Sequence, residues 1–236
     1  MRVVGIDVGT RQLHAVALDE HARVVGVAVL DATRPDAVVG WTAAADAVAV
    51  DAPDRWSTAP HATDDDLSPK FRTARCGEIA LAREHRVWVP WVTPTRPVEG
   101  WIRVGIDLFA ALRAAGHEPV EVYPHAVFCA LGGRRPPPKQ QLAGAEARIR
   151  LLESAGLTAT SLPMWSHDAL DAAAAALVAL HHANGVARPA TCGHDGSAIW
   201  LPALPDNGNH AGDGNTGPGG SATGVAEPAP SPLGPG

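Results

Sequence analysis

Four carboxylates stand where core elements are predicted to begin or end, and they are the residues of this chain best suited to chemistry. Asp7 and Asp51 each close a short apolar run, whereas Asp168 and Asp171 lie three residues apart at the start of an alanine-rich segment. Positions three apart share one face of a helix, so Asp168 and Asp171 can point at the same spot. If all four acids meet, they cannot all ionise without cations.

Carboxylate oxygens without His or Cys partners are hard ligands that suit Mg²⁺ or Mn²⁺. Two such ions close together serve in-line phosphodiester hydrolysis, because one activates water and the other stabilises the leaving oxygen. The acids therefore predict a two-metal hydrolytic site, with Asp7, Asp51, Asp168 and Asp171 as both metal ligands and catalytic residues.

These acids also have structural interpretations. Asp7 could close its strand and cap the following turn. Asp168 could be a first-turn acid behind an N-cap at Ser166, stabilised by the helix dipole. Asp171 fits this interpretation less well, because the residues after it are so apolar that the helix should be buried on most sides.

The elements that position these acids begin with strands. Apolar, β-branched runs within 2–10, 12–19 and 22–30 predict three strands, and their short connections allow only an antiparallel meander. A helix over 35–45 then leads to a strand over 47–50. Since right-handed crossovers dominate, this fourth strand should run parallel to the first and beside it.

Asp7 and Asp51 would then lie side by side at the edge of the sheet where ligands gather in α/β proteins. The loop over 52–69 is long, and loops of this length are usually functional or mobile. Periodicity and breakers predict further helices over 71–85, 100–115, 142–155 and 166–184, and short strands over 86–92, 119–123 and 198–201, the last at an edge. We expect a mixed sheet flanked by helices.

Composition predicts one domain and a tail. Residues 1–203 can form a single packed core, whereas 204–236 are mostly small residues, Gly and Pro, and are expected to be disordered. The formal charge of -6 is ordinary for a soluble protein and mildly disfavours tight non-specific nucleic-acid binding. The sequence shows no leader and no membrane span, which predicts a cytoplasmic protein without membrane contact.

The sulfur and imidazole groups do not predict a site. The chain has three cysteines at wide spacing, which indicates neither a disulfide framework nor a zinc knuckle, so reduced thiols are expected. His181 with His182, and Cys192 with His194, could suggest a transition metal, but two scattered pairs do not make a site. The acidic run over 64–66 is most simply a solvated loop.

The order of elements and the acids resemble the ribonuclease H-like superfamily. Gly5 to Gly9 and His167 to Ala172 look like the first and last catalytic motifs of Holliday-junction resolvases, which usually have glutamate where this chain has Asp51. A closer resemblance is to the DUF429 family of predicted nucleases. It is carried by residues 50–53, 72–78, 93–94 and 121–124, by Lys139, Gly144 and Arg148, and by 167–172. This resemblance implies a ribonuclease H-like fold and a metal-dependent nuclease.

An anionic substrate must be held against an acidic site, so basic residues near it are candidates for phosphate contacts. The candidate substrate-binding residues are Arg72, Arg75, Tyr123, Lys139 and Arg148. The basic residues could instead form a solvated helix face, Tyr123 could be a core residue, and Glu78 could simply pair with Arg75.

Three functions remain open. The leading one is a nuclease acting on a nucleic acid of unspecified type. The segment Gly5 to Thr10 also resembles the first phosphate loop of actin-like sugar kinases, although the chain is too short for both halves of such an enzyme. The third is a non-catalytic module that binds nucleic acid or protein on the same fold. The sequence gives no signal for oligomeric state.

Overall fold

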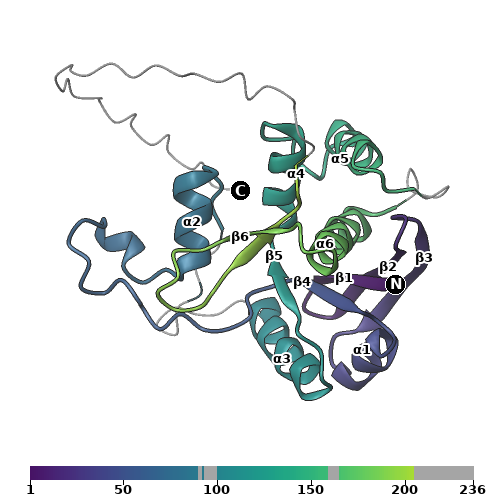
Figure 1. Ribbon diagram of the computed structural model, residues 1–236, viewed down its shortest axis with the longest axis horizontal. Coiled ribbons are helices and arrows are strands. Elements are labelled where there is room, and N and C mark those ends of the chain that lie inside the picture. The colour runs from purple at the N-terminus through teal and green to yellow at the C-terminus, as the bar shows by residue number, and fades with distance from the viewer. Residues whose placement is uncertain (90–91, 93–99, 159–164, 205–236) are drawn as a thin grey trace. The chain divides into compact units, whose positions relative to one another are not determined.

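The computed structural model of the chain describes residues 1–89, 92, 100–158 and 165–204. Its first three strands, β1 (Arg2–Val8), β2 (Gln12–Asp19) and β3 (Val24–Asp31), form the expected antiparallel meander (Figure 1). β3 begins two residues later than predicted, because the Asp19 carboxylate accepts the backbone N–H groups of His21 and Arg23 and keeps this segment in a turn.

Among the described residues the sheet has seven strands in the order β3-β2-β1-β4-β5-β7-β6. β4 (Ala47–Asp51) lies parallel to β1, as the crossover predicts. β5 (Val120–Val122) and β7 (Ile199–Leu201) continue the parallel part, and β6 (Arg188–Ala190) closes it as an antiparallel edge. The result is the mixed ribonuclease H-like sheet that the sequence predicts.

Two of the predicted strands are corrected by the structure. The last strand was expected at an edge, but β7 is internal, because β6, which the sequence analysis missed, pairs outside it. The strand expected over 86–92 is not formed in its described residues, 86–89 and 92. A short run of apolar and β-branched residues therefore did not suffice to form a strand, because no neighbouring strand pairs with residues 86–89 or 92.

Helices cover both faces of the sheet because the side chains of β1 alternate. Val4 and Ile6 pack with α1 (Pro35–Thr42) and α3 (Gly100–Ala114) on one face. The other face is covered by α4 (Pro124–Gly132), α5 (Leu142–Ser154) and α6 (His167–Ala183). Figure 1 shows these two helical layers on opposite sides of the strands.

Gly5 lets α6 lie directly on the middle of β1. A Cβ atom at this position would stand 2.0 Å from the backbone nitrogen of Ala176 and 2.2 Å from the carbonyl oxygen of Ala172. Only a glycine on the strand and small residues on the helix permit this approach. The consequence is that the first turns of α6 lie next to the end of β1.

The helices differ from prediction in two places. α2 (Cys76–Glu84) is shorter than the helix expected over 71–85, because Pro69–Phe71 form a separate 3-10 turn, η1, before it. α4 was not predicted, although Pro124 at its first position is a common helix start. The other predicted helices, including the one that carries Asp168 and Asp171, are present.

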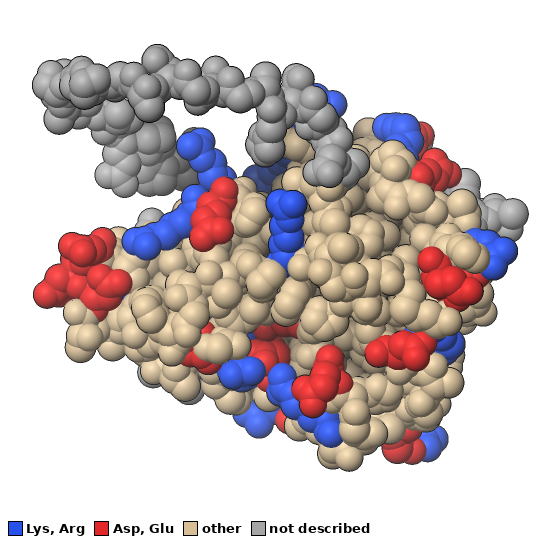
Figure 2. Space-filling model, in the orientation of Figure 1, with Lys and Arg blue, Asp and Glu red and all other residues tan. Residues whose placement is uncertain are grey.

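The tail expected over 204–236 lies, apart from its first residue, outside the described residues. Within the described part of the chain, no helix is long and apolar enough to cross a membrane. On the face seen in Figure 2, basic and acidic side chains are scattered among other residues rather than gathered in one patch of a single sign.

Candidate functional site

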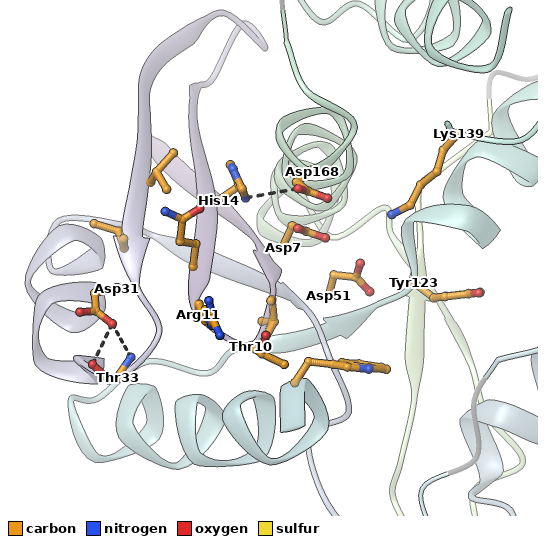
Figure 3. A pocket seen from close by; sticks show the side chains of 16 residues that line it. Asp7, Thr10, Arg11, His14, Asp31, Thr33, Asp51, Tyr123, Lys139 and Asp168 are labelled. Atoms are coloured by element: carbon orange, nitrogen blue, oxygen red, sulfur yellow. Dashed lines mark hydrogen bonds and ion pairs between the residues drawn. The ribbon is translucent and has the colours of Figure 1, made fainter. Parts of the chain in front are cut away.

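The register between β1 and β4 places Asp7 directly opposite Asp51, at the carboxyl ends of two parallel strands. Asp171 joins them from α6, and one carboxylate oxygen of each of the three residues lies within 4.8 Å of the others. Asp7 is 8% exposed and Asp171 is 5% exposed. Three carboxylates are therefore crowded into a mostly buried space, as Figure 3 shows for Asp7 and Asp51.

Asp168 belongs to a second group that shares Asp7. Potential ligand atoms of Asp7, His14 and Asp168 also lie within 4.8 Å of one another. Ser166 caps α6 by accepting the backbone N–H of Ala169 at 3.2 Å, which fixes the first turn from which Asp168 projects. The cluster thus consists of two adjacent sets of three groups, joined at Asp7.

Crowding and burial disfavour the charged forms of Asp7, Asp51 and Asp171. Burial, followed by the charges of Asp171 and Asp168, raises the pKa of Asp7 to about 7. Burial and the neighbouring Asp7 raise the pKa of Asp51 well above its ordinary value. Burial also raises the pKa of Asp171, although Lys139 opposes the shift. A positive charge in this space would relieve the repulsion.

Lys139 is the cation that contacts the cluster. Its Nζ atom lies 2.7 Å from Oδ2 of Asp171, and the side chain is 36% exposed. Burial lowers the pKa of Lys139, but the carboxylates of Asp171, Asp7 and Asp51 outweigh this effect and raise it. One ammonium group cannot neutralise three carboxylates, so the cluster keeps an excess of negative charge whenever its acids ionise.

Two adjoining clefts open onto the cluster. One, of about 1190 Å³, extends towards the β1–β2 turn and β3, and Figure 3 shows Arg11 and His14 among its walls. The other, of about 820 Å³, extends towards the Pro-rich loop over 133–141. Asp51, Tyr123 and Lys139 line both, so the acids stand at the junction of one continuous surface hollow.

Three of the predicted substrate-binding residues lie in these clefts. Tyr123 and Lys139 are at the junction, and Arg148 lines the second cleft. Arg148 is 3% exposed; its guanidinium stacks over Phe128 and donates to the carbonyl oxygens of Pro137 and Gly144. Among the residues that the structure describes, its Nε atom has no hydrogen-bond partner.

The other two predicted substrate-binding residues lie away from these clefts. Arg72 pairs with Asp65 and donates to the carbonyl oxygen of Leu67, and it lines neither cleft. Arg75 is 1% exposed and binds buried carboxylates, including Glu78 as the sequence allowed. Tertiary pairing with distant acids, which periodicity does not report, decides the environment of both.

His14 is the residue of the site that sequence reasoning missed. It stands opposite Asp7 across the β1–β2 hairpin, and its Nδ1 atom lies 4.0 Å from Oδ2 of Asp168. The short hairpin connection contains the signal, because residues equally far from the turn face each other. His167, the first residue of α6, lies 2.6 Å from Oδ1 of Asp168 through its Nδ1 atom.

The expectation of reduced thiols is wrong for two of the three cysteines in this structure. Cys76 and Cys192, which are 116 residues apart, are joined by a disulfide, and Cys129 is free. The chain folds α2 against β6 and β7 and thereby brings these sulfurs together. The histidine pair does not join them, because His181 accepts a backbone N–H and His182 packs on Trp200.

The strand order, the crossover and the acidic helix define a ribonuclease H-like α/β domain with a carboxylate cluster at the ends of its parallel strands. The chain belongs to the family described as "Protein of unknown function (DUF429)", whose match covers residues 5–192.

Similar solved structures include two of RuvC from Thermus thermophilus. The protein in complex with a Holliday junction substrate is 16% identical, with a TM-score of 0.42. Another structure of the same protein is 18% identical, with a TM-score of 0.43. Both matches cover 85% of this chain and 100% of the other. No curated protein sequence matches the chain.

Proposed function

We propose that this protein is a metal-dependent nuclease that hydrolyses phosphodiester bonds at the cluster of Asp7, Asp51, Asp168 and Asp171. The proposal rests on one observation. One oxygen of each of three mostly buried carboxylates lies within 4.8 Å of the others, and among the described residues the only cation in contact with them is Lys139. A folded chain gains nothing from such repulsion unless an external cation binds there.

The donor set fits Mg²⁺ or Mn²⁺. Carboxylate oxygens are the ligands these hard cations prefer, and the two sets of groups that share Asp7 offer two neighbouring positions. The residues holding the ions would be Asp51 and Asp171 on one side and Asp168 on the other, with Asp7 between them. When bound, two such cations supply Lewis acidity for the attack of water and for the departing oxygen.

Residues around the acids are suited to hold the phosphate backbone. Arg11 lines the first cleft, and Arg134 and Arg135 line the second, so basic groups stand on both sides of the cluster. Phosphate contacts of this kind position a nucleic acid without reading its sequence. A strand lying along the hollow would place a phosphodiester over the acids while its flanking phosphates meet the arginines.

Lys139 and Tyr123 line both clefts at the junction where a phosphate would lie. Lys139 lowers the pKa of the acids and so favours their ionised, cation-binding forms. Burial and the nearby Asp51 raise the pKa of Tyr123, which keeps its hydroxyl protonated and able to donate a hydrogen bond. The unpartnered Nε of Arg148 offers one further buried donor at the second cleft.

The experiment that tests the proposal is cleavage of labelled single-stranded, duplex, RNA–DNA hybrid and branched nucleic acids with Mn²⁺. We expect the wild type to cut at least one of these substrates, and Asp7→Asn and Asp171→Asn to lose at least 100-fold in rate, because each removes a carboxylate ligand of the proposed metal site. The matched control is Asp31→Asn. Asp31 lines the same cleft, but its carboxylate is bound by Thr33 and lies outside the cluster.

Activity in Asp31→Asn at the wild-type level would separate the cluster from the general charge of the cleft. If the wild type cuts nothing although it binds Mn²⁺ through Asp7, the nuclease proposal fails and the site serves another phosphoester or a binding function. If Asp7→Asn and Asp171→Asn retain full activity, the cleavage arises elsewhere, and the carboxylate assignment fails.

A further inference from the structure

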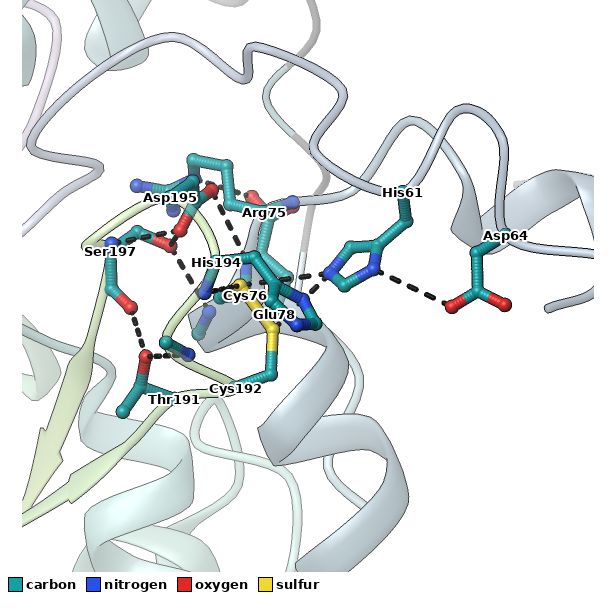
Figure 4. The surroundings of a disulfide bond; sticks show 12 residues. His61, Asp64, Arg75, Cys76, Glu78, Thr191, Cys192, His194, Asp195 and Ser197 are labelled. Atoms are coloured by element: carbon teal, nitrogen blue, oxygen red, sulfur yellow. Dashed lines mark hydrogen bonds and ion pairs between the residues drawn. A yellow bond between two sulfur atoms is a disulfide. The ribbon is translucent and has the colours of Figure 1, made fainter. Parts of the chain in front are cut away.

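A second group of metal-ligating side chains lies away from the carboxylate cluster. His61, Cys76, Cys192 and His194 each offer one ligand atom, and these four atoms lie within 4.8 Å of one another (Figure 4). His61 comes from the long loop before η1, Cys76 begins α2, and the other two residues lie in the turn between β6 and β7. Three segments far apart in the sequence thus converge on one point.

The chemistry of this group differs from that of the carboxylate cluster. Two sulfurs and two imidazole nitrogens are the ligand set of structural zinc sites, which are tetrahedral and closed. We propose that, when its cysteines are reduced, the protein binds one Zn²⁺ ion through His61, Cys76, Cys192 and His194. With two thiolates and two neutral imidazoles, the ion and its ligands would carry no net charge.

The distances fit such a site apart from the bond between the sulfurs. Nε2 of His61 lies 3.2 Å from Sγ of Cys192 and 3.6 Å from Sγ of Cys76. With zinc–sulfur bonds of about 2.3 Å and zinc–nitrogen bonds of about 2.0–2.1 Å, tetrahedral ligands lie roughly 3.3–3.8 Å apart. His61 is therefore already in position, and the two bonded sulfurs must separate, by side-chain rotation.

The interconversion of the two forms balances with a dithiol reductant. Two electrons and two protons from the dithiol convert the Cys76–Cys192 disulfide into two thiols, and the dithiol becomes a disulfide. Zn²⁺ then replaces the two thiol protons, which pass to water. The disulfide seen here and the zinc complex are thus alternative states of the same pair of cysteines.

Groups around the four ligands have the arrangement that zinc ligands usually have. The Asp64 carboxylate lies 3.7 Å from Nδ1 of His61, on the ring nitrogen that would not bind the metal. Such a carboxylate orients the ring and leaves Nε2 as the ligand. The backbone N–H of His194 points to Sγ of Cys76 at 3.3 Å, and Cys76 stands at a helix N-terminus, where the thiolate is favoured.

The turn that carries Cys192 and His194 is fixed by its own hydrogen bonds. Gly193, between the two ligands, has φ +83°, which a larger residue would adopt only with strain. Asp195 accepts the N–H and hydroxyl of Ser197 and the backbone N–H of Cys76. The turn is therefore tied to α2 by contacts that do not depend on the sulfurs.

A zinc ion here would have a structural function. Four protein ligands leave no open position for water, and the ion would fasten the loop of His61 to α2 and to the edge of the sheet. Cys192 and His194 are exposed, whereas His61 and Cys76 are buried, so an ion can enter from the surface side. This inference does not rest on the nuclease proposal.

The test uses the full chain, purified anaerobically with a phosphine reductant after growth with zinc. We expect one zinc per chain by elemental analysis and three free thiols after denaturation. Replacement by Co²⁺ should give thiolate-to-cobalt charge-transfer absorption, which reports sulfur ligands and so distinguishes this site from the carboxylate cluster, which has none. His194→Ala, at an exposed position, should weaken zinc binding at least 10-fold, and Cys192→Ser, which leaves Cys76 as the remaining thiolate ligand, should reduce the charge-transfer band.

Cys129→Ser is the matched control, because it removes the third cysteine and should leave zinc content and the cobalt spectrum unchanged. The proposal is overturned if the reduced, folded wild type binds no zinc. It is also overturned if His194→Ala and Cys192→Ser hold zinc as tightly as wild type, or if cobalt binds without thiolate absorption. Since His194→Ala replaces an exposed side chain, its result does not depend on whether Cys192→Ser folds.

Discussion

Two groups of buried carboxylates lie in the part of this protein that the structure describes, and they are neutralised in different ways. Around Arg75, the guanidinium binds Glu121 through two contacts of 2.7 Å, Glu78 at 3.1 Å and Asp54 at 3.3 Å. Asp54 also binds Arg113 at 2.8 Å. Every acid of this group has a guanidinium partner supplied by the chain itself.

The cluster of Asp7, Asp51 and Asp171 also consists of carboxylates but lacks such compensation. Lys139 contacts Asp171 alone within ion-pair distance, and it is partly exposed. The pKa of Asp7 is raised to about 7, whereas the pKa of Asp54, held by its arginines, is lowered although burial opposes this. Burial raises the pKa of Glu78 and of Glu121, but Arg75 opposes both shifts. Burial of acids therefore does not by itself indicate a site; burial without an internal counter-ion does.

The largest expected effect is a loss of stability when the cation of the Arg75 group is removed. Arg75→Met would leave Glu78, Glu121 and Asp54 buried without their shared partner, which should lower the free energy of unfolding by about 3–5 kcal/mol. Urea unfolding measures this. Arg72→Met is the matched control, because Arg72 pairs with the exposed Asp65 and should cost less than about 1 kcal/mol. Equal losses in the two variants would show that the buried network does not need its cation.

The second prediction concerns a substitution that should move the acid cluster without changing any of its acids. Gly5→Ala puts a Cβ against the backbone of α6, so the helix that carries Asp168 and Asp171 must move away from β1. We expect a loss of about 1–3 kcal/mol and, on the proposed function, a large loss of cleavage. Gly40→Ala, where a Cβ would meet nothing within 4 Å, is the control. Unchanged stability in Gly5→Ala would mean that the close packing of α6 on β1 is not required.

The third prediction concerns pH. Because the folded-state pKa of Asp7 is raised from 3.8 to about 7, the folded protein holds this proton more tightly than the unfolded chain. The tighter binding of this proton stabilises the folded protein below about pH 4, and this stabilisation is lost as the pH rises through 7. At pH 8 with a chelator, Asp7→Asn should therefore be more stable than wild type by ~1–3 kcal/mol, and Mn²⁺ should stabilise only the wild type.

Asp31→Asn has the opposite expectation, since the N–H and hydroxyl of Thr33 lower the pKa of Asp31 and favour its charged form. It should gain no stability at pH 8. Urea unfolding from pH 4 to pH 8 distinguishes the two variants. A wild type whose metal-free stability does not fall across this range would contradict the repulsion inferred for the cluster.

The smallest effect is expected from the single cation at the cluster. Lys139→Met removes a charge that lowers the pKa of Asp7, Asp51 and Asp171, so the acids should ionise at higher pH. The midpoint of Mn²⁺-induced thermal stabilisation should then move upward by less than about one pH unit. Lys139→Arg keeps the charge and should show a smaller shift. A midpoint that moves downward in Lys139→Met would show that Lys139 mainly competes with the metal.

The first half of the sheet and the position of the acids along it could be predicted from the amino-acid sequence. Alternating apolar residues and short connections define the meander, and the handedness of the crossover places Asp51 beside Asp7. Helical spacing places Asp168 and Asp171 on adjacent turns of one face. These features depend on local periodicity and on chirality, which a single chain displays directly.

Which charges are compensated and which ligands meet depends on the tertiary structure. Arg75 resembles a phosphate-binding residue in sequence, yet Glu121, 46 residues away, binds it. Likewise His61 and Cys76 join Cys192 and His194 only because α2 packs on β6 and β7. Such contacts arise from long-range packing, so the spacing of residues along the chain does not predict them.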